Sequence, residues 1–156
     1  MIPTRLAADD RAVSTTVTYV LTMAITAVLL GGLITAAGGL VENQRTQAVR
    51  NELGVIGERM AGELTSVDSL VRAGENPTVR LRATHRRQVA GRYYSVELVT
   101  DGPPCPGQQC LVLSTDDVTV TVPFATETPV RRGNVSGGTV VIEYDTANGT
   151  LGVTAP

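Results

Sequence analysis

One stretch of the sequence constrains the fold more than any other: thirty consecutive residues, 12–41, carry no charged side chain. This is longer than the roughly 20 apolar residues that a helix needs to cross a bilayer. It is also longer than the roughly 7–15-residue apolar core of a cleavable secretory signal, and no A-x-A-like site closes it. The stretch therefore predicts a membrane helix, and its place near the N-terminus is typical of a tethered or assembling surface protein.

Two spacings inside this stretch bear on what the helix contacts. Small residues recur at every fourth position, at Ala27, Gly31, Thr35 and Gly39. Such a ridge lets membrane helices approach closely, so it predicts packing against like helices. Hydroxyl side chains recur at the same interval, at Ser14, Thr18, Thr22 and Thr26. For these we favour the simpler interpretation that each hydroxyl bonds back to the carbonyl four residues earlier.

The helical period continues beyond the apolar stretch, over residues 42–74. Seven apolar residues form one stripe, Val49, Leu53, Ile56, Met60, Leu64, Val67 and Val71. Charged residues, Asp68 among them, fill the other faces, so this part is predicted to be amphipathic. Three glycines are expected to weaken or bend it by up to ~1 kcal/mol each, Gly54, Gly57 and Gly62. The helix is predicted to end near residues 73–74, with Asn76-Pro77 as the stop.

The remaining chain, residues 75–156, alternates apolar and polar side chains in several short runs. These runs predict five or six strands in an antiparallel sheet, with one face free to cover the helix. Asn148-Gly149 predicts a type I′ hairpin turn between the last two strands. The expected fold class is therefore α+β: a long N-terminal helix, transmembrane and then amphipathic, packed on a small β-rich head.

The two cysteines and two sequons point to an oxidising, extracellular location. Cys105 and Cys110 are separated by four residues rich in Pro, Gly and Gln, which favours a small disulfide loop over free thiols. A zinc site is disfavoured, because it needs two more ligands and the chain has a single histidine. Asn134 and Asn148 begin N-x-S/T sequons for N-glycosylation. For Asn148 the alternative is a plain turn residue. A disulfide implies an oxidising compartment.

The sequence offers little material for catalysis or for a cofactor. His85 is surrounded by arginines, with no carboxylate nearby in the sequence to orient it, and we expect it to be a turn residue. Asp116-Asp117 lacks the further oxygen ligands of a cation site and is expected to lie at a strand entry. No phosphate loop or nucleophile elbow is present. We therefore expect no enzymatic activity, no catalytic residue, no metal and no cofactor.

Five arginines fall within thirteen residues of the head: Arg80, Arg82, Arg86, Arg87 and Arg92. One interpretation is a docking patch for an acidic partner. The alternative, which we favour, is the solvated face and turn of a hairpin, offset by Glu75, Glu97 and Asp101. The formal charge of −2 and the sequence pI of about 5.4 argue against nucleic acid as a partner.

The junction at residues 9–15, Asp-Asp-Arg-Ala-Val-Ser-Thr, followed at once by the apolar stretch, resembles archaeal type IV pilin-like proteins. That family includes archaellins and the small pilin-like proteins common in halophiles, and the absence of lysine agrees with it. The resemblance implies that Arg11 and Ala12 are recognised by a prepilin peptidase, that residues 1–12 are a leader, and that the mature chain begins at Val13. Val17 departs from the glutamate that bacterial pilins carry near this place.

The resemblance further implies the organisation and work of the mature protein. Residues 13–41 would be the transmembrane or filament-core helix, and residues 75–156 the extracellular head. The implied function is that of a minor pilin or pseudopilin, in filament assembly or adhesion, with the membrane, the peptidase and other pilin-like subunits as partners. Arg5 and Arg11 favour a cytoplasmic N-terminus. The alternative is an uncleaved single-pass protein whose extracellular domain binds a partner.

Overall fold

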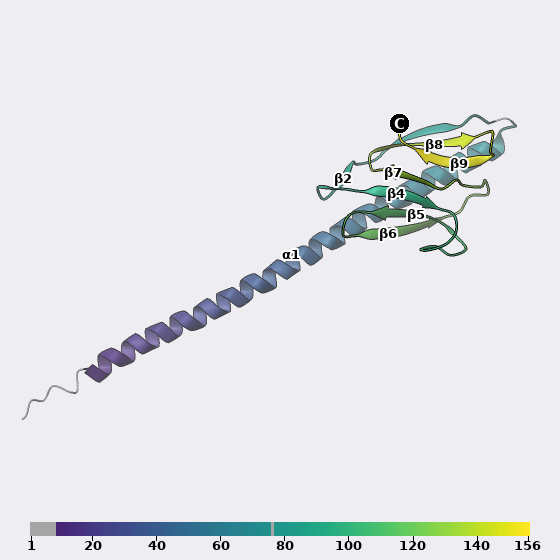
Figure 1. Ribbon diagram of the computed structural model, residues 1–156. Coiled ribbons are helices and arrows are strands. Elements are labelled where there is room, and N and C mark those ends of the chain that lie inside the picture. The colour runs from purple at the N-terminus through teal and green to yellow at the C-terminus, as the bar shows by residue number, and fades with distance from the viewer. Residues whose placement is uncertain (1–8, 76) are drawn as a thin grey trace, which may run out of the picture. The chain divides into compact units, whose positions relative to one another are not determined.

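The computed structural model describes residues 9–75 and 77–156, with side chains from Thr16 onward (Figure 1). In these residues one helix, α1 (Asp9–Ala73), is followed by nine strands. The strands are β1 (Arg80–Thr84), β2 (Gln88–Val89), β3 (Arg92–Tyr93), β4 (Ser95–Val99), β5 (Gln109–Ser114), β6 (Thr119–Phe124), β7 (Gly133–Ser136), β8 (Thr139–Asp145) and β9 (Thr150–Thr154). A helix packed on antiparallel sheets is an α+β layout, so the predicted fold class is confirmed.

The chain divides into two compact units, residues 1–44 and residues 45–156. In the described residues the first unit consists of α1 from Asp9 to Gln44, with no strand. The second unit, called the head below, contains the remainder of α1 and all nine strands. The predicted leader, residues 1–12, falls on residues that the structure does not describe or describes without side chains, so it stays a prediction.

The head contains more strands, and more sheets, than the sequence predicted. Three strands form one sheet in the order β1-β8-β9, four form another in the order β6-β5-β4-β7, and β2 pairs with β3. All of these pairings are antiparallel. The expectation of five or six strands in one sheet is therefore wrong. The strands it missed, β2, β3 and β7, have two to four residues each, too few for a visible alternation.

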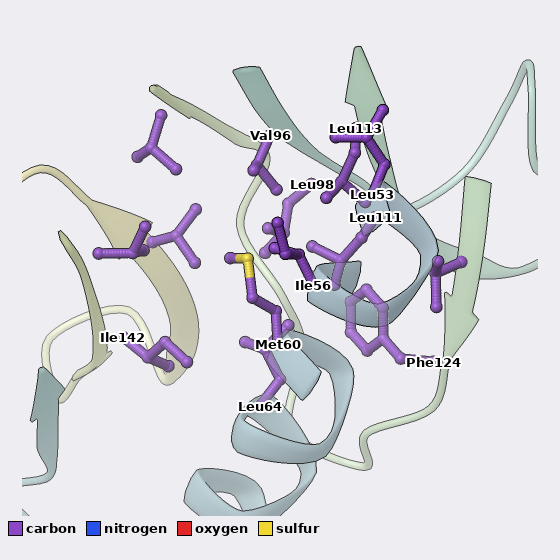
Figure 2. Close-up of a cluster of buried hydrophobic side chains, with 14 of the residues drawn as sticks. Leu53, Ile56, Met60, Leu64, Val96, Leu98, Leu111, Leu113, Phe124 and Ile142 are labelled. Carbon is purple, nitrogen blue, oxygen red and sulfur yellow. The ribbon is translucent and has the colours of Figure 1, made fainter. Parts of the chain in front are cut away.

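The predicted apolar stripe of α1 forms the centre of the core. All seven of its residues are buried, together with apolar side chains from both larger sheets. Figure 2 shows Leu53, Ile56, Met60 and Leu64 directed into a cluster with side chains from β4 to β6 and with Ile142 of β8. The helix ends at Ala73, as predicted, and the amide of Gly74 donates to the carbonyl of Val71. Asn76, half of the predicted stop, lies outside the described residues.

Gly57 allows close packing between α1 and the four-stranded sheet, a role that the sequence did not predict. A Cβ atom at Gly57 would lie 2.6 Å from Cγ2 of Val122 and 2.8 Å from Cδ1 of Leu113. At Gly54 and Gly62 a Cβ atom would meet nothing within 4 Å. Gly57 therefore lets α1 approach the four-stranded sheet, whereas the other two glycines have no such packing reason.

The predicted hairpin exists, but its turn differs from the predicted one. Asp145 of β8 pairs with Thr150 of β9, so four residues, 146–149, form the loop where a type I′ turn has two. The two-residue loop of the head is instead Ala90-Gly91, between β2 and β3. Both residues have positive φ, +48° and +80°, as a type I′ turn requires. Because alanine rarely adopts positive φ, this turn could not be predicted from its residue types.

Candidate functional site

The first candidate surface is the apolar stretch of α1, residues 16–41. Its large apolar side chains are 53–74% exposed, from Val17 to Val41. Within the described chain, α1 is the one helix that is long and apolar enough to cross a membrane. A helix that is apolar all round belongs in a protein core or a bilayer. No part of its most apolar window is buried inside the protein, which is consistent with single-pass membrane anchoring.

The threonine hydroxyls of this stretch are satisfied by the helix itself. Thr22 donates to the carbonyl of Thr18, Thr26 to that of Thr22, and Thr35 to that of Gly31, at 2.8–2.9 Å. For Thr22 and Thr26 the simpler interpretation is therefore confirmed. An unbonded hydroxyl is costly in hydrocarbon, so these bonds suit a helix surrounded by lipid or by other apolar helices.

The predicted packing ridge lies open on this helix. A Cβ atom at Gly31 or Gly39 would meet no other atom within 4 Å. Thr35 lies between these glycines with its hydroxyl turned back to the helix backbone, and Ala27 is exposed. Nothing in the described part of the first unit covers the ridge, so a second helix has access to its backbone. Whether another subunit occupies it stays a prediction.

The arginine cluster of the head is largely neutralised within the chain. Arg80 pairs with Glu143 across β1 and β8, with Nε to Oε2 at 3.8 Å. Nη1 of Arg86 lies 2.8 Å from Oε1 of Glu52 on α1.

Arg92 of β3 pairs with Asp117. The other two members, Arg82 and Arg87, make no ion pair with any described residue and are exposed. Carboxylates of the chain offset three of the arginines, as the interpretation that we favoured requires, and Asp117 is one of these carboxylates. The expected carboxylates were different ones, Glu75, Glu97 and Asp101, and none of these forms an ion pair with the cluster among the described residues. The five arginines do not act as one unpaired positive patch.

His85 lies against a carboxylate that the sequence did not reveal. Its side chain is 2% exposed, and Nε2 lies 3.2 Å from Oε2 of Glu63 on α1. Neither atom has a hydrogen-bond partner among the described residues, while Oε1 of Glu63 accepts from Arg59. The expectation that His85 has no carboxylate beside it is wrong, because Glu63 is distant in sequence but adjacent in space. The contact places the segment after β1 next to α1.

An open groove runs beside this contact. It has a volume of about 680 Å³ and lies between α1 and the segment 84–86. Its apolar lining comes from Ala48, Ile56 and the exposed Val55. The charged groups around it are already paired with each other, as Glu52–Arg86 and Arg59–Glu63. No group of three metal-ligating side chains occurs in the described residues.

Asp68 is a buried carboxylate that sequence reasoning placed on a solvent face. It is 4% exposed and accepts hydrogen bonds from the backbone amides of Glu127 and Thr128, at 3.2 and 2.9 Å. Burial raises the pKa of Asp68, but the hydrogen bonds from Thr128 and Glu127 and the charge of Arg72 outweigh burial and lower its pKa. The ionised carboxylate thus fastens the β6–β7 loop to α1.

The cysteine loop forms its own small cluster on the head. Cys105 and Cys110 form a disulfide with Cα atoms 6.3 Å apart. Both cysteines are buried with Val99 and Val112 in a cluster separate from the main core. The carboxylate of Asp101 accepts from the amides of Gly102 and Gly107, which orders the loop before the second cysteine.

The two sequons lie in different surroundings. Asn134 is exposed in the middle of β7, and Asn148 is exposed in the loop between β8 and β9. At Asn148 the side-chain amide donates to Oδ2 of Asp145 at 2.7 Å. Hydrogen bonds lower the pKa of Asp145, and the bond from the Asn148 side chain has the largest effect. Asn148 therefore lies in the turn and supports it, in agreement with the alternative interpretation of Asn148 as a plain turn residue.

A family model covers nearly the whole chain, residues 8–155. The chain belongs to DUF7266, a family of unknown function. No curated protein and no solved structure matches the sequence. The DUF7266 match runs through the apolar stretch of α1 and through every strand of the head. The membrane-compatible helix and the β-rich head are therefore parts of one family unit, and neither is an addition peculiar to this chain.

Proposed function

We propose that this DUF7266 protein is a pilin-like structural component of the cell surface, anchored by α1 with its head outside. One observation carries the proposal: residues 16–41 expose large apolar side chains on every face, whereas the same helix buries a single stripe from Val49 to Val71. Water suits the second pattern but not the first. Its work is assembly or adhesion, as a minor pilin or pseudopilin.

Two further features support the extracellular placement of the head, and a third supports assembly. The disulfide between Cys105 and Cys110 suits an oxidising compartment. Arg5 and Arg11 precede the apolar stretch, as in helices whose N-terminus stays in the cytoplasm. The open Gly31–Gly39 ridge suits association with sister helices in the membrane or in a filament.

The leader hypothesis is tested by the mass of the mature N-terminus. We expect protein isolated from its own cells to lack Met1 to Ala12 and to begin at Val13. R11Q should block the cut, whereas R5Q removes a cation of the same leader outside the recognition pair and should leave processing unchanged. A mature protein that retains Met1 would contradict processing and favour the alternative, an uncleaved single-pass protein with a partner-binding head.

Assembly is tested separately, by shearing cells and comparing the filament fraction with the membrane pellet. A filament subunit should appear in the sheared fraction, and G31L or G39L should reduce its amount because each places a large side chain on the ridge. V28L changes volume next to the ridge and serves as the control. Equal recovery of all variants would remove the ridge from the proposal.

A further inference from the structure

The two sequons of the head differ in whether their hydroxyl residue can be reached. N-glycosylation requires the asparagine together with a Ser or Thr two residues later. The Thr150 hydroxyl is buried, with no hydrogen-bond partner in the described chain. The amide of Asn148 is held by Asp145, which also accepts from the Asn148 backbone amide at 3.3 Å. Once the head has folded, this sequon does not present its two side chains together.

The sequon at Asn134 has the opposite arrangement. Asn134 and Ser136 are both exposed, while Val135 between them is buried. Because side chains alternate across a strand, Asn134 and Ser136 lie on the same outward face of β7. Neither side chain makes a hydrogen bond or ion pair with any residue that the structure describes.

Asn134 is exposed although β7 has neighbours on both sides. On one side β9 lies close, and a Cβ atom at Gly133 would be 3.2 Å from the carbonyl oxygen of Val153. On the other side β7 has a paired neighbour in the sheet order β6-β5-β4-β7. That neighbour, β4, places exposed Glu97 opposite Asn134 and Ser95 opposite Ser136. A saccharide on Asn134 would project from this polar face without displacing any core side chain.

We propose that Asn134 is an N-glycosylation site of the folded head and that Asn148 is not. This inference rests on the proposed function, because it requires a head outside the cytoplasm. The co-reactant is a saccharide carried on a lipid phosphate or diphosphate. The Asn134 amide nitrogen forms a bond to the anomeric carbon, the bond from that carbon to the phosphate oxygen breaks, and the nitrogen loses one proton as the lipid phosphate leaves.

The experiment compares the intact mass and the peptide maps of the full-length protein, isolated from its own cells, with those of five variants. We expect the wild type to exceed its sequence mass by one saccharide, located on the peptide that contains Asn134. N134Q and S136A should lose the added mass completely. N148Q and T150A should retain it in full, and S136T, which keeps the hydroxyl, should retain it as well.

Protease protection of the head in the same cells separates the two proposals. A head outside the cell with an unmodified Asn134 peptide would overturn the site and leave the proposed function standing. A saccharide on Asn148 would overturn the selectivity, since it would show attachment before the Thr150 hydroxyl is buried. A head protected on the cytoplasmic side would overturn both proposals together.

Discussion

The helix α1 contains two stretches, the apolar residues 16–41 and the amphipathic residues 42–73. They differ in which side chains lie around the helix axis. Leu33 is 67% exposed, whereas Leu53 is fully buried. Around Leu53 the other faces carry charged side chains, so one side suits water and the other suits the sheets. Around Leu33 no face carries a charge. The comparison teaches that the distribution of charge around the helix, more than its apolar content, decides whether protein or lipid must cover it.

The largest expected effect comes from truncating leucine in each stretch. L53A removes a fully buried side chain and should lower the free energy of unfolding of the head by about 2–5 kcal/mol. L33A removes an exposed side chain and should change it by less than about 0.5 kcal/mol. Chemical denaturation of both full-length variants in detergent measures the difference. Equal losses would break the comparison between the two stretches.

A smaller effect on the free energy of unfolding is expected at Asp68, a buried charged residue of the second stretch. D68N keeps the shape of the side chain but turns one acceptor into a donor that faces a backbone amide. It should therefore lower the free energy of unfolding of the head by about 1.5–3 kcal/mol at neutral pH. The control is D116N, an exposed aspartate, which should have little effect. Unchanged stability of D68N would show that the β6–β7 loop is held by other contacts.

The same carboxylate predicts a pH dependence. The pKa of Asp68 is lower in the folded head than its ordinary value of 3.8, so the folded state binds the proton less readily than the unfolded chain. Its contribution is therefore complete well above pH 3.8 and is lost as the pH falls through the folded pKa. The difference in the free energy of unfolding between wild type and D68N should narrow as the pH falls from 7 to 3. Parallel curves would contradict this assignment.

The smallest of the three effects separates two glycines of the second stretch. G57A forces a Cβ atom against Val122 and Leu113 and should lower the free energy of unfolding by about 1–3 kcal/mol. G54A meets open space and should stabilise the helix by about 0.5–1 kcal/mol. Thermal unfolding of the two variants should therefore shift in opposite directions. Stabilisation by both would mean that α1 and the sheet do not approach closely at Gly57.

The sequence predicted what depends on periodicity and missed what depends on distant contacts. The stripe from Val49 to Val71 could be read because a helix repeats every 3.6 residues, and each of its members is buried. Asp68 looked like a surface charge, because its partners lie about sixty residues away in a loop. Glu63 was missed as a neighbour of His85 for a similar reason, because it lies on α1, in a different element from His85.

Short elements were the other source of error. β7 presents one buried residue, Val135, which no alternation can reveal. The turn at Ala90-Gly91 forms with an alanine at positive φ, a conformation that residue type does not announce. Among the surface features, the arginine cluster was visible in sequence, but its pairing with Glu52, Glu143 and Asp117 depends on the folded head.

The central claim is that residues 16–41 need lipid or sister helices to cover them. Its most direct test is fractionation of the full-length protein from broken cells, with and without detergent. We predict that it sediments with membranes or filaments, resists washing with high salt and alkaline carbonate, and enters solution only with detergent. A monomer that stays in the soluble fraction without detergent would contradict the account.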